Sequence, residues 1–229
     1  MSDESRRRVP ASSLVPHPSS LVPLRSIILI GFMGSGKSSV ARRLARRLKW
    51  EAVDLDQSIE RAAGRRIAEI FAGDGEDAFR ALETAALREA LQTPSVIATG
   101  GGIVTRPENR ELLREASEQG ALVVYLRATP QRLVERIRRQ PGKRPLIDGD
   151  ALLNEVDTRK RVEHLLADRA RFYESCADVI VDTDALRPDE VAEAIQRLYK
   201  REGHRRWVIG TATQVMDSDE LKRFLKDSK

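Results

Sequence analysis

Residues 26–40 read SIILIGFMGSGKSSV, and this stretch decides the fold. The apolar run at 27–30 predicts a buried strand of a parallel sheet. Residues 31–38 match the G-x-x-x-x-G-K-[ST] pattern of a phosphate-binding loop, and the apolar residues after Ser39 recur at helical spacing. The pattern needs a strand before it and a helix after it. Because both are present, we predict nucleotide binding rather than a chance match.

The residue types of this loop suit phosphate chemistry. Glycines let the backbone curl tightly so that N–H groups can face the phosphates, and the helix N-terminus adds a partial positive charge. We predict that Lys37 reaches the outer phosphates and that the Ser38 hydroxyl ligates Mg²⁺. The predicted nucleotide-binding residues of the loop are Gly34, Ser35, Gly36, Lys37, Ser38 and Ser39.

Composition narrows the class of protein. With 229 residues, 41% of them hydrophobic, the chain fits one α/β domain with tails. No apolar run approaches the ~20 residues of a membrane span. Cys176 is the only cysteine, so no internal disulfide can form and nothing argues for secretion. The net charge of +5 suits nucleic acid or small anionic substrates, and the lack of aromatics among the basic residues disfavours nucleic acid.

The chain divides into three regions. Residues 1–24 are rich in Ser, Pro and Arg and predict a disordered extension. This extension lacks the continuous apolar core of a signal peptide, so we expect a cytoplasmic protein. Residues 25–202 alternate strands with helices, which predicts a three-layer α/β/α P-loop fold with a five-stranded parallel sheet. Residues 203–229 form a C-terminal extension, with a possible short strand at 207–209 and a small helix, to which we assign no function.

The expected elements can be placed along the middle region. The five predicted strands lie at 27–30, 50–56, 95–99, 121–126 and 177–182. The predicted helices lie at 39–48, 57–63, 67–71, 76–91, 107–118, 129–139, 151–174 and 188–200. In the helix at 76–91 we expect Phe79, Leu82, Ala86 and Leu87 to face inward. Residues 140–150, QPGKRPLIDGD, have the composition of a mobile lid.

Two strand ends carry candidate chemistry. Asp54 and Asp56 end the second strand, at the edge of the sheet where Lys37 lies. If strand geometry continues to Asp56, the two carboxylates point the same way. One could then hold a Mg²⁺-bound water and the other could orient or deprotonate a hydroxyl nucleophile; alternatively, Asp56 caps the next helix. Residues 100–102 are three glycines after the third strand, which favours close approach of a substrate over a simple turn.

Several stretches together resemble the shikimate kinase family. They are GFMGSGKSSV, DLD, GRRIAEIF, GEDAFRALE, TGGG, KRPL, DRARFY and VDT, in this order over residues 26–200. The first is common to many phosphate-binding loops, but the ordered set is highly specific. The resemblance implies Mg²⁺-dependent phosphoryl transfer from ATP to the 3-hydroxyl of shikimate, in the biosynthesis of aromatic amino acids.

The resemblance also implies roles on the acceptor side. Asp54 and Ser38 correspond to the metal ligands, and Asp56 to the residue that holds the shikimate hydroxyls and is the candidate base. Two arginines correspond to those that grip the carboxylate, one of them oriented by a glutamate three residues on, and two glycines offer backbone to the substrate. These residues are Arg80, Arg169, Glu83, Gly101 and Gly102.

On the nucleotide side, Arg144 resembles the lid arginine that reaches the γ-phosphate. Arg139 is the expected partner of the adenine, and the stretch at 185–188, with Arg187, lies where the family packs its other face. The expected catalytic set is therefore Lys37, Asp56 and Arg144. We expect a monomer that binds shikimate and ATP and neither nucleic acid nor membrane.

Two other functions stay open on sequence alone. A related kinase for gluconate would share the fold, but it gives no reason for Arg80 and Arg169 together. A catalytically silent relative could bind nucleotide in a regulatory role. The intact Lys37, Asp56 and Arg144 argue against that second alternative.

Overall fold

A computed structural model describes residues 26–139, 155–202 and 214–216. The predicted N-terminal extension, the lid with Arg144 and the possible strand at 207–209 lie outside these described residues.

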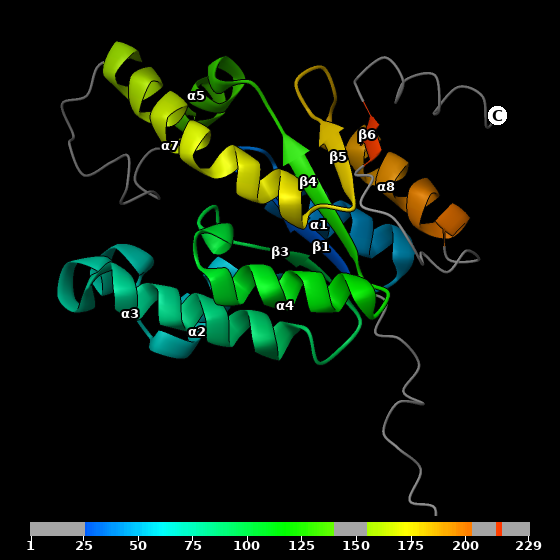
Figure 1. The fold of residues 1–229 in the computed structure, drawn as a ribbon, viewed down its shortest axis with the longest axis horizontal. Coiled ribbons are helices and arrows are strands. Elements are labelled where there is room, and N and C mark those ends of the chain that lie inside the picture. Colours follow the sequence, from blue (N-terminus) through cyan, green and yellow to red (C-terminus); the bar gives the residue numbers. More distant parts are fainter. Residues whose placement is uncertain (1–25, 140–154, 203–213, 217–229) are drawn as a thin grey trace, which may run out of the picture.

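The described chain is built on a parallel sheet with strand order β2-β3-β1-β4-β5-β6 (Figure 1). The central strand β1 (Ile27–Ile30) pairs with β3 and β4, so that Ile28 lies beside Ile97 on one side and Val123 on the other. The five predicted strands are confirmed, and a sixth short strand, which we did not predict, pairs with β5 at one edge. The other strands are β2 (Glu51–Asp54), β3 (Ser95–Ala98), β4 (Leu122–Arg127), β5 (Val179–Asp182) and β6 (Gln214–Met216).

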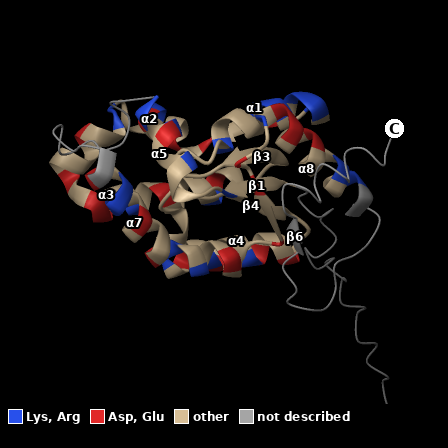
Figure 2. Cartoon of the chain, turned by 90° about the horizontal axis from the view of Figure 1, so that it is seen from above, with Lys and Arg blue, Asp and Glu red and all other residues tan. Residues whose placement is uncertain are grey.

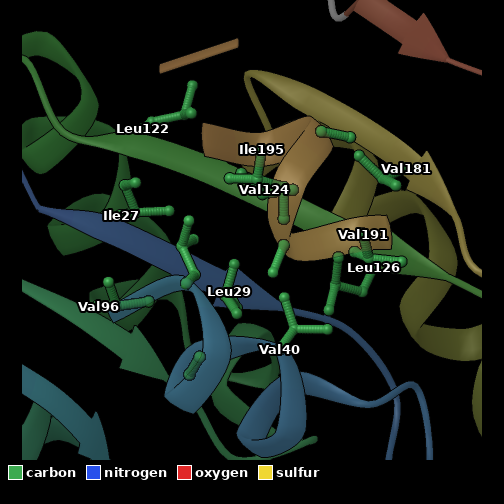
Figure 3. Close-up of a cluster of buried hydrophobic side chains, with 14 of the residues drawn as sticks. Ile27, Leu29, Val40, Val96, Leu122, Val124, Leu126, Val181, Val191 and Ile195 are labelled. Atoms are coloured by element: carbon green, nitrogen blue, oxygen red, sulfur yellow. The ribbon is translucent and has the colours of Figure 1, made fainter. Parts of the chain in front are cut away.

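Helices cover both faces of the sheet, which confirms the three-layer prediction. Side chains of α1 (Lys37–Leu48) and α8 (Pro188–Glu202) pack on one face, where Leu29, Val40 and Ile195 meet (Figure 3). The opposite face is covered by α3 (Ile67–Ala90), α4 (Pro107–Glu118) and α7 (Glu155–Cys176). Figure 2 shows α1 and α8 on one side of the sheet and α4 on the other, with charged residues mainly on the helices. The strands alternate their side chains between two apolar faces, as a buried parallel sheet requires.

The smaller helices complete the frame. The helix α5 (Pro130–Arg138) packs against α7 and buries Leu133 and Ile137 around Phe32 of the loop after β1. The helix α2 (Leu55–Ala63) packs against α3 and ends at Gly64, which has the left-handed φ of 65° expected for this position. No helix among the described residues is long and apolar enough to cross a bilayer.

The structure corrects three boundaries or faces. The second strand ends at Asp54 rather than Asp56, because the Asp54 carboxylate caps α2 by accepting a hydrogen bond from the Gln57 amide at 3.3 Å. The predicted helices at 67–71 and 76–91 form one helix, α3, with a kink at Gly75. Leu82 was expected to be buried but is exposed.

The inward face of α3 is charged instead. Arg80 and Glu83 are buried at 4% and 0% exposure, beside Phe79 and Leu87, which are buried as predicted. An apolar-periodicity argument does not anticipate this, because it assumes that charged residues face water. A buried arginine and glutamate three residues apart on one helix can form an ion pair, and they are the starting point for the site.

Candidate active site

The phosphate-binding loop follows β1 at the centre of the sheet. Its last glycine, Gly36, caps α1 with a φ of 102°, a conformation that residues with a Cβ rarely adopt. Lys37 is the first residue of α1 rather than a loop residue, and its side chain is buried. Its Nζ donates hydrogen bonds to the Gly31 carbonyl at 2.7 Å and the Phe32 carbonyl at 3.0 Å. The ammonium group therefore lies inside the curl of the loop, where a bound phosphate would meet it.

The other predicted loop residues lie around this group. Gly34 and Ser35 form the turn, and the Ser35 amide donates to the Phe32 carbonyl at 3.1 Å. Ser38 and Ser39 are in the first turn of α1, whose N–H groups have no partner within the helix and favour an anion. The structure thus places all six predicted loop residues in one strand–loop–helix unit.

Asp56 lies in the first turn of α2, close to the glycines after β3. A Cβ built on Gly100 would lie 2.9 Å from Asp56 Oδ1 and 2.2 Å from Glu83 Oε1, so both carboxylates flank this glycine. Burial raises the pKa of Asp56 to about 7, with further contributions from the charges of Glu83 and Asp54, while Lys37 opposes the rise. The phosphate loop and the two acidic side chains therefore belong to one electrostatic unit.

Arg80 is held by two glutamates of its own helix. Its Nη1 donates to Glu83 Oε2 at 2.5 Å, which confirms the predicted i,i+3 contact. Its Nη2 and Nε donate to Glu76 Oε1 at 2.8 and 3.1 Å. Burial raises the pKa of Glu83 despite the opposing charges of Arg80 and Arg169. Since the Glu76 side chain is 54% exposed, it can leave Arg80 at low cost, whereas Glu83 is fixed.

The three glycines allow charged groups to lie directly against the backbone. A Cβ on Gly102 would come within 2.1 Å of Arg80 Nη1, so only glycine leaves room for the guanidinium. A Cβ on Gly101 would lie 3.0 Å from the Met33 amide nitrogen, so this turn also touches the phosphate loop. The Gly101 carbonyl accepts hydrogen bonds from Arg169 Nη1 at 3.3 Å and from the Tyr173 hydroxyl at 2.5 Å.

Arg169 reaches the same place from α7. Its side chain is buried, and its guanidinium lies over the ring of Phe32 at 5.9 Å from the centroid. The structure thus gathers side chains from α2, α3 and α7 at the carboxyl end of β3. We call the group formed by Asp56, Arg80, Glu83, Arg169 and the glycines 100–102 the charged cluster.

One arginine at the loop was missed by sequence reasoning. Arg136 of α5 donates to the Thr183 carbonyl at 2.7 Å and hydroxyl at 3.1 Å, and to the Gly34 and Ser35 carbonyls at 3.5 Å. Burial lowers its pKa. The available signal was its spacing of three residues from Leu133, which is on the buried face of α5.

The two arginines that we predicted for the adenine side are both exposed. Arg139 is exposed and is the C-cap residue that follows α5. The side chain of Arg187, the residue before α8, is 80% exposed. Its guanidinium contacts Glu190 in the first turn of that helix. Among the described residues, Arg136 is therefore the α5 arginine that the structure places against the phosphate loop.

The residues present fit a magnesium ion that arrives with a nucleotide. No group of three or more His, Cys, Asp or Glu side chains among the described residues could form a protein-only metal site. Ser38 and Asp54 offer a hydroxyl and a carboxylate oxygen. Mg²⁺ in nucleotide-dependent enzymes is typically bound by one or two such oxygens, with phosphates and waters completing its octahedron.

Fold and site define a class of protein. A phosphate-binding loop follows the central strand of a parallel sheet, and a buried cluster of acids and arginines lies beside it at the carboxyl ends of the strands. This arrangement is that of a P-loop kinase for a small molecule.

Comparison with known proteins makes the assignment specific. The family model described as shikimate kinase matches residues 33–200, and the chain belongs to this family. The shikimate kinase of Enterococcus faecalis is 40% identical over 177 residues, covering 76% of this chain and 99% of that protein. That of Symbiobacterium thermophilum is 42% identical over 179 residues, covering 77% and 97%. The solved structure of shikimate kinase from Acinetobacter baumannii in complex with shikimate superposes with a TM-score of 0.71 at 32% identity, covering 82% of this chain and 99% of that chain.

Proposed function

We propose that this protein transfers the γ-phosphoryl group of ATP to the 3-hydroxyl of shikimate. The observation that carries the proposal is the charged cluster beside the phosphate loop, in which Arg80 and Arg169 flank the buried Glu83. Family membership identifies shikimate as the acceptor, and the cluster supplies the matching chemistry. A phosphate loop alone would support any nucleotide-binding function.

The acceptor is recognised first through its carboxylate. Guanidinium groups bind carboxylates through paired N–H donors, and these pairs are stronger than neutral hydrogen bonds. Arg80 already holds the exchangeable Glu76 carboxylate on its Nε and Nη2 atoms. A substrate carboxylate can replace Glu76 there while Glu83 keeps the guanidinium in place on Nη1.

The acceptor hydroxyl is activated beside the phosphate loop. Asp56 is the candidate base, because its carboxylate flanks Gly100, interacts electrostatically with Lys37 and has its pKa raised to about 7 by burial and by neighbouring acids. Lys37 holds the phosphate oxygens on which negative charge changes during transfer. Ser38 and Asp54 would hold the Mg²⁺ that comes with ATP, and this ion would neutralise further phosphate charge. We propose Arg136 as a further arginine of the nucleotide side, and Arg139 stays the proposed partner of the adenine.

The test is a coupled assay of ADP release with purified protein, ATP, Mg²⁺ and shikimate, with ³¹P NMR of the product to locate the phosphate. We expect turnover with shikimate above the rate without acceptor, and phosphate on the 3-hydroxyl. Gluconate is the informative competitor, because it carries a carboxylate and hydroxyls on an open chain. Equal turnover of gluconate, or no turnover of shikimate, would contradict the proposed acceptor.

A further inference from the structure

The carbonyl of Gly101 is held by two donors from one helix. The Tyr173 hydroxyl donates to it at 2.5 Å and Arg169 Nη1 donates at 3.3 Å. Positions four apart lie on the same face of a helix, so both side chains of α7 reach the turn at 100–102 together. The shorter contact belongs to Tyr173, and 3.3 Å is beyond the usual N–H···O range. The tyrosine therefore provides the main anchor of this carbonyl.

Tyr173 itself has a fixed position. It is fully buried, and its ring stacks on Tyr125 with centroids 4.9 Å apart and an angle of 21° between the planes. Burial also raises the pKa of Tyr173 well above its usual range, so the hydroxyl stays protonated and acts as a donor at any physiological pH. A rigid ring whose hydroxyl always donates can hold the flexible backbone at Gly101 in one position.

The turn at 100–102 needs such an anchor. Three consecutive glycines have no side chains to restrict their backbone angles. Their placement nevertheless matters, because Gly100 lies against Asp56 and Glu83, Gly102 lies against Arg80, and Gly101 lies against the phosphate loop. Since the peptide group is planar and trans, fixing the Gly101 carbonyl also fixes the Gly102 N–H, which points the opposite way. Within the described part of the chain this amide makes no hydrogen bond.

We infer that Tyr173 is a positioning residue of the acceptor site. Its hydroxyl holds the turn at 100–102 in register with Asp56 and Arg80, and it relieves Arg169 of this task so that the guanidinium can turn to the acceptor carboxylate. The kinetic part of this inference rests on the proposed function. The anchoring of the turn does not.

The test compares Tyr173→Phe with Tyr125→Phe. Each variant removes one hydroxyl from the same ring stack, but only the Tyr173 hydroxyl bonds to Gly101. For Tyr173→Phe we expect a rise of about 3- to 10-fold in KM for shikimate, the range of one lost hydrogen bond, and a KM for ATP within about twofold of the parent. For Tyr125→Phe we expect neither KM to change.

A second readout does not depend on activity. The Ile103 and Thr105 amides donate to the Gly100 and Gly102 carbonyls at 3.3 and 2.9 Å, so their hydrogen exchange reports on the turn. We expect Tyr173→Phe to speed this exchange about 3- to 10-fold relative to Tyr125→Phe. Equal exchange in the two variants would overturn the inference, as would equal KM values for shikimate. If the parent does not act on shikimate, the proposed function fails, and exchange alone decides the role of Tyr173.

Discussion

The phosphate loop and the charged cluster lie side by side but are built in different ways. The loop is one continuous segment, in which Lys37 bonds to carbonyls five and six residues before it. The charged cluster draws Asp56, Arg80 and Arg169 from three helices spread over more than a hundred residues. The loop works mainly through backbone groups and one cation, whereas the cluster works through side chains that must pair with one another. The first can form wherever its short pattern folds, but the second exists only in the complete fold.

The largest expected effect comes from a substitution in the phosphate loop alone. Lys37→Ala removes the cation that meets the migrating phosphoryl group, and we expect turnover to fall by at least ~10³-fold. Lys37 is buried and bonded to two loop carbonyls, so a modest fall in Tm is expected as well. Arg42→Ala, on the exposed side of the same helix, is the control and should leave turnover unchanged. Near-parent turnover in a folded Lys37→Ala protein would refute the loop assignment.

The second effect falls on the charged cluster. Arg80→Lys keeps the charge but loses the planar fork that bonds Glu83 and Glu76 at once. We expect kcat/KM for shikimate to fall roughly 30- to 1,000-fold, corresponding to about 2–4 kcal/mol for a broken buried charge pair. Nucleotide affinity, measured by calorimetry, should change little.

Arg88→Lys is the matched control for this variant, because Arg88 is on the exposed side of α3. It should behave as the parent in both measurements. If Arg80→Lys instead changes only the KM for ATP, the charged cluster does not bind shikimate while the loop binds ATP, as we propose.

The same contrast explains what the sequence could predict. The strand, loop and helix around Lys37 follow from local patterns, and the five predicted strands are confirmed. Apolar periodicity failed at Leu82, because α3 turns Arg80 and Glu83 inward, where they form an ion pair. No local pattern shows a pairing of charges with groups on other helices.

Other misses have the same origin. The exact partner of each arginine depends on which helix face meets the loop, and so the contact of Arg136 with the loop carbonyls was overlooked. The role of Arg139 at the adenine stays a prediction. The end of the second strand was misplaced, because the capping role of Asp54 depends on where α2 begins. The edge strand β6 is three residues long and has too weak a pattern to predict. Arg80, Glu83 and Arg169 were found only through resemblance to a family, whereas Asp56 was also indicated by its place after the second strand.

A third prediction sharpens the claim that the glycines seat the cluster. Gly102→Ala places a Cβ where Arg80 Nη1 now lies, 2.1 Å away, so the guanidinium must move. We expect kcat/KM for shikimate to fall about 10- to 100-fold, with little change in ATP binding. Gly73→Ala is the control, because its Cβ would make only an ordinary contact of 3.7 Å with Arg65. Equal kinetics in the two variants would show that Gly102 has no part in placing Arg80.

The smallest expected effect is on folding stability, because the fold buries the Asp56 carboxylate of the charged cluster. Burial first, and then Glu83 and Asp54, raise the pKa of Asp56 from 3.8 to about 7. The folded protein therefore keeps the proton of Asp56 at pH values where the unfolded chain has released it. Below the pKa of Asp56 in the unfolded chain, the carboxyl is protonated in both the folded and the unfolded state, so it does not reduce folding stability. As pH rises from 3.8 to about 7 the stabilising proton is lost, and the charged carboxylate then destabilises the fold.

Asp56→Asn should accordingly raise the Tm at pH 8 by about 3–6 °C, measured without nucleotide in metal-free buffer, and should raise it by less than half as much at pH 5. Asp77→Asn is the control, because the side chain of Asp77 is fully exposed, and it should give no such pH dependence. A Tm gain that is equal at both pH values would mean that the fold does not raise the pKa of Asp56. The loop side offers no corresponding gain, because Lys37→Ala removes a cation that bonds to two carbonyls. Stability released by mutation in the charged cluster, but lost by mutation in the loop, would identify the cluster as the part of the site that the fold holds under electrostatic strain.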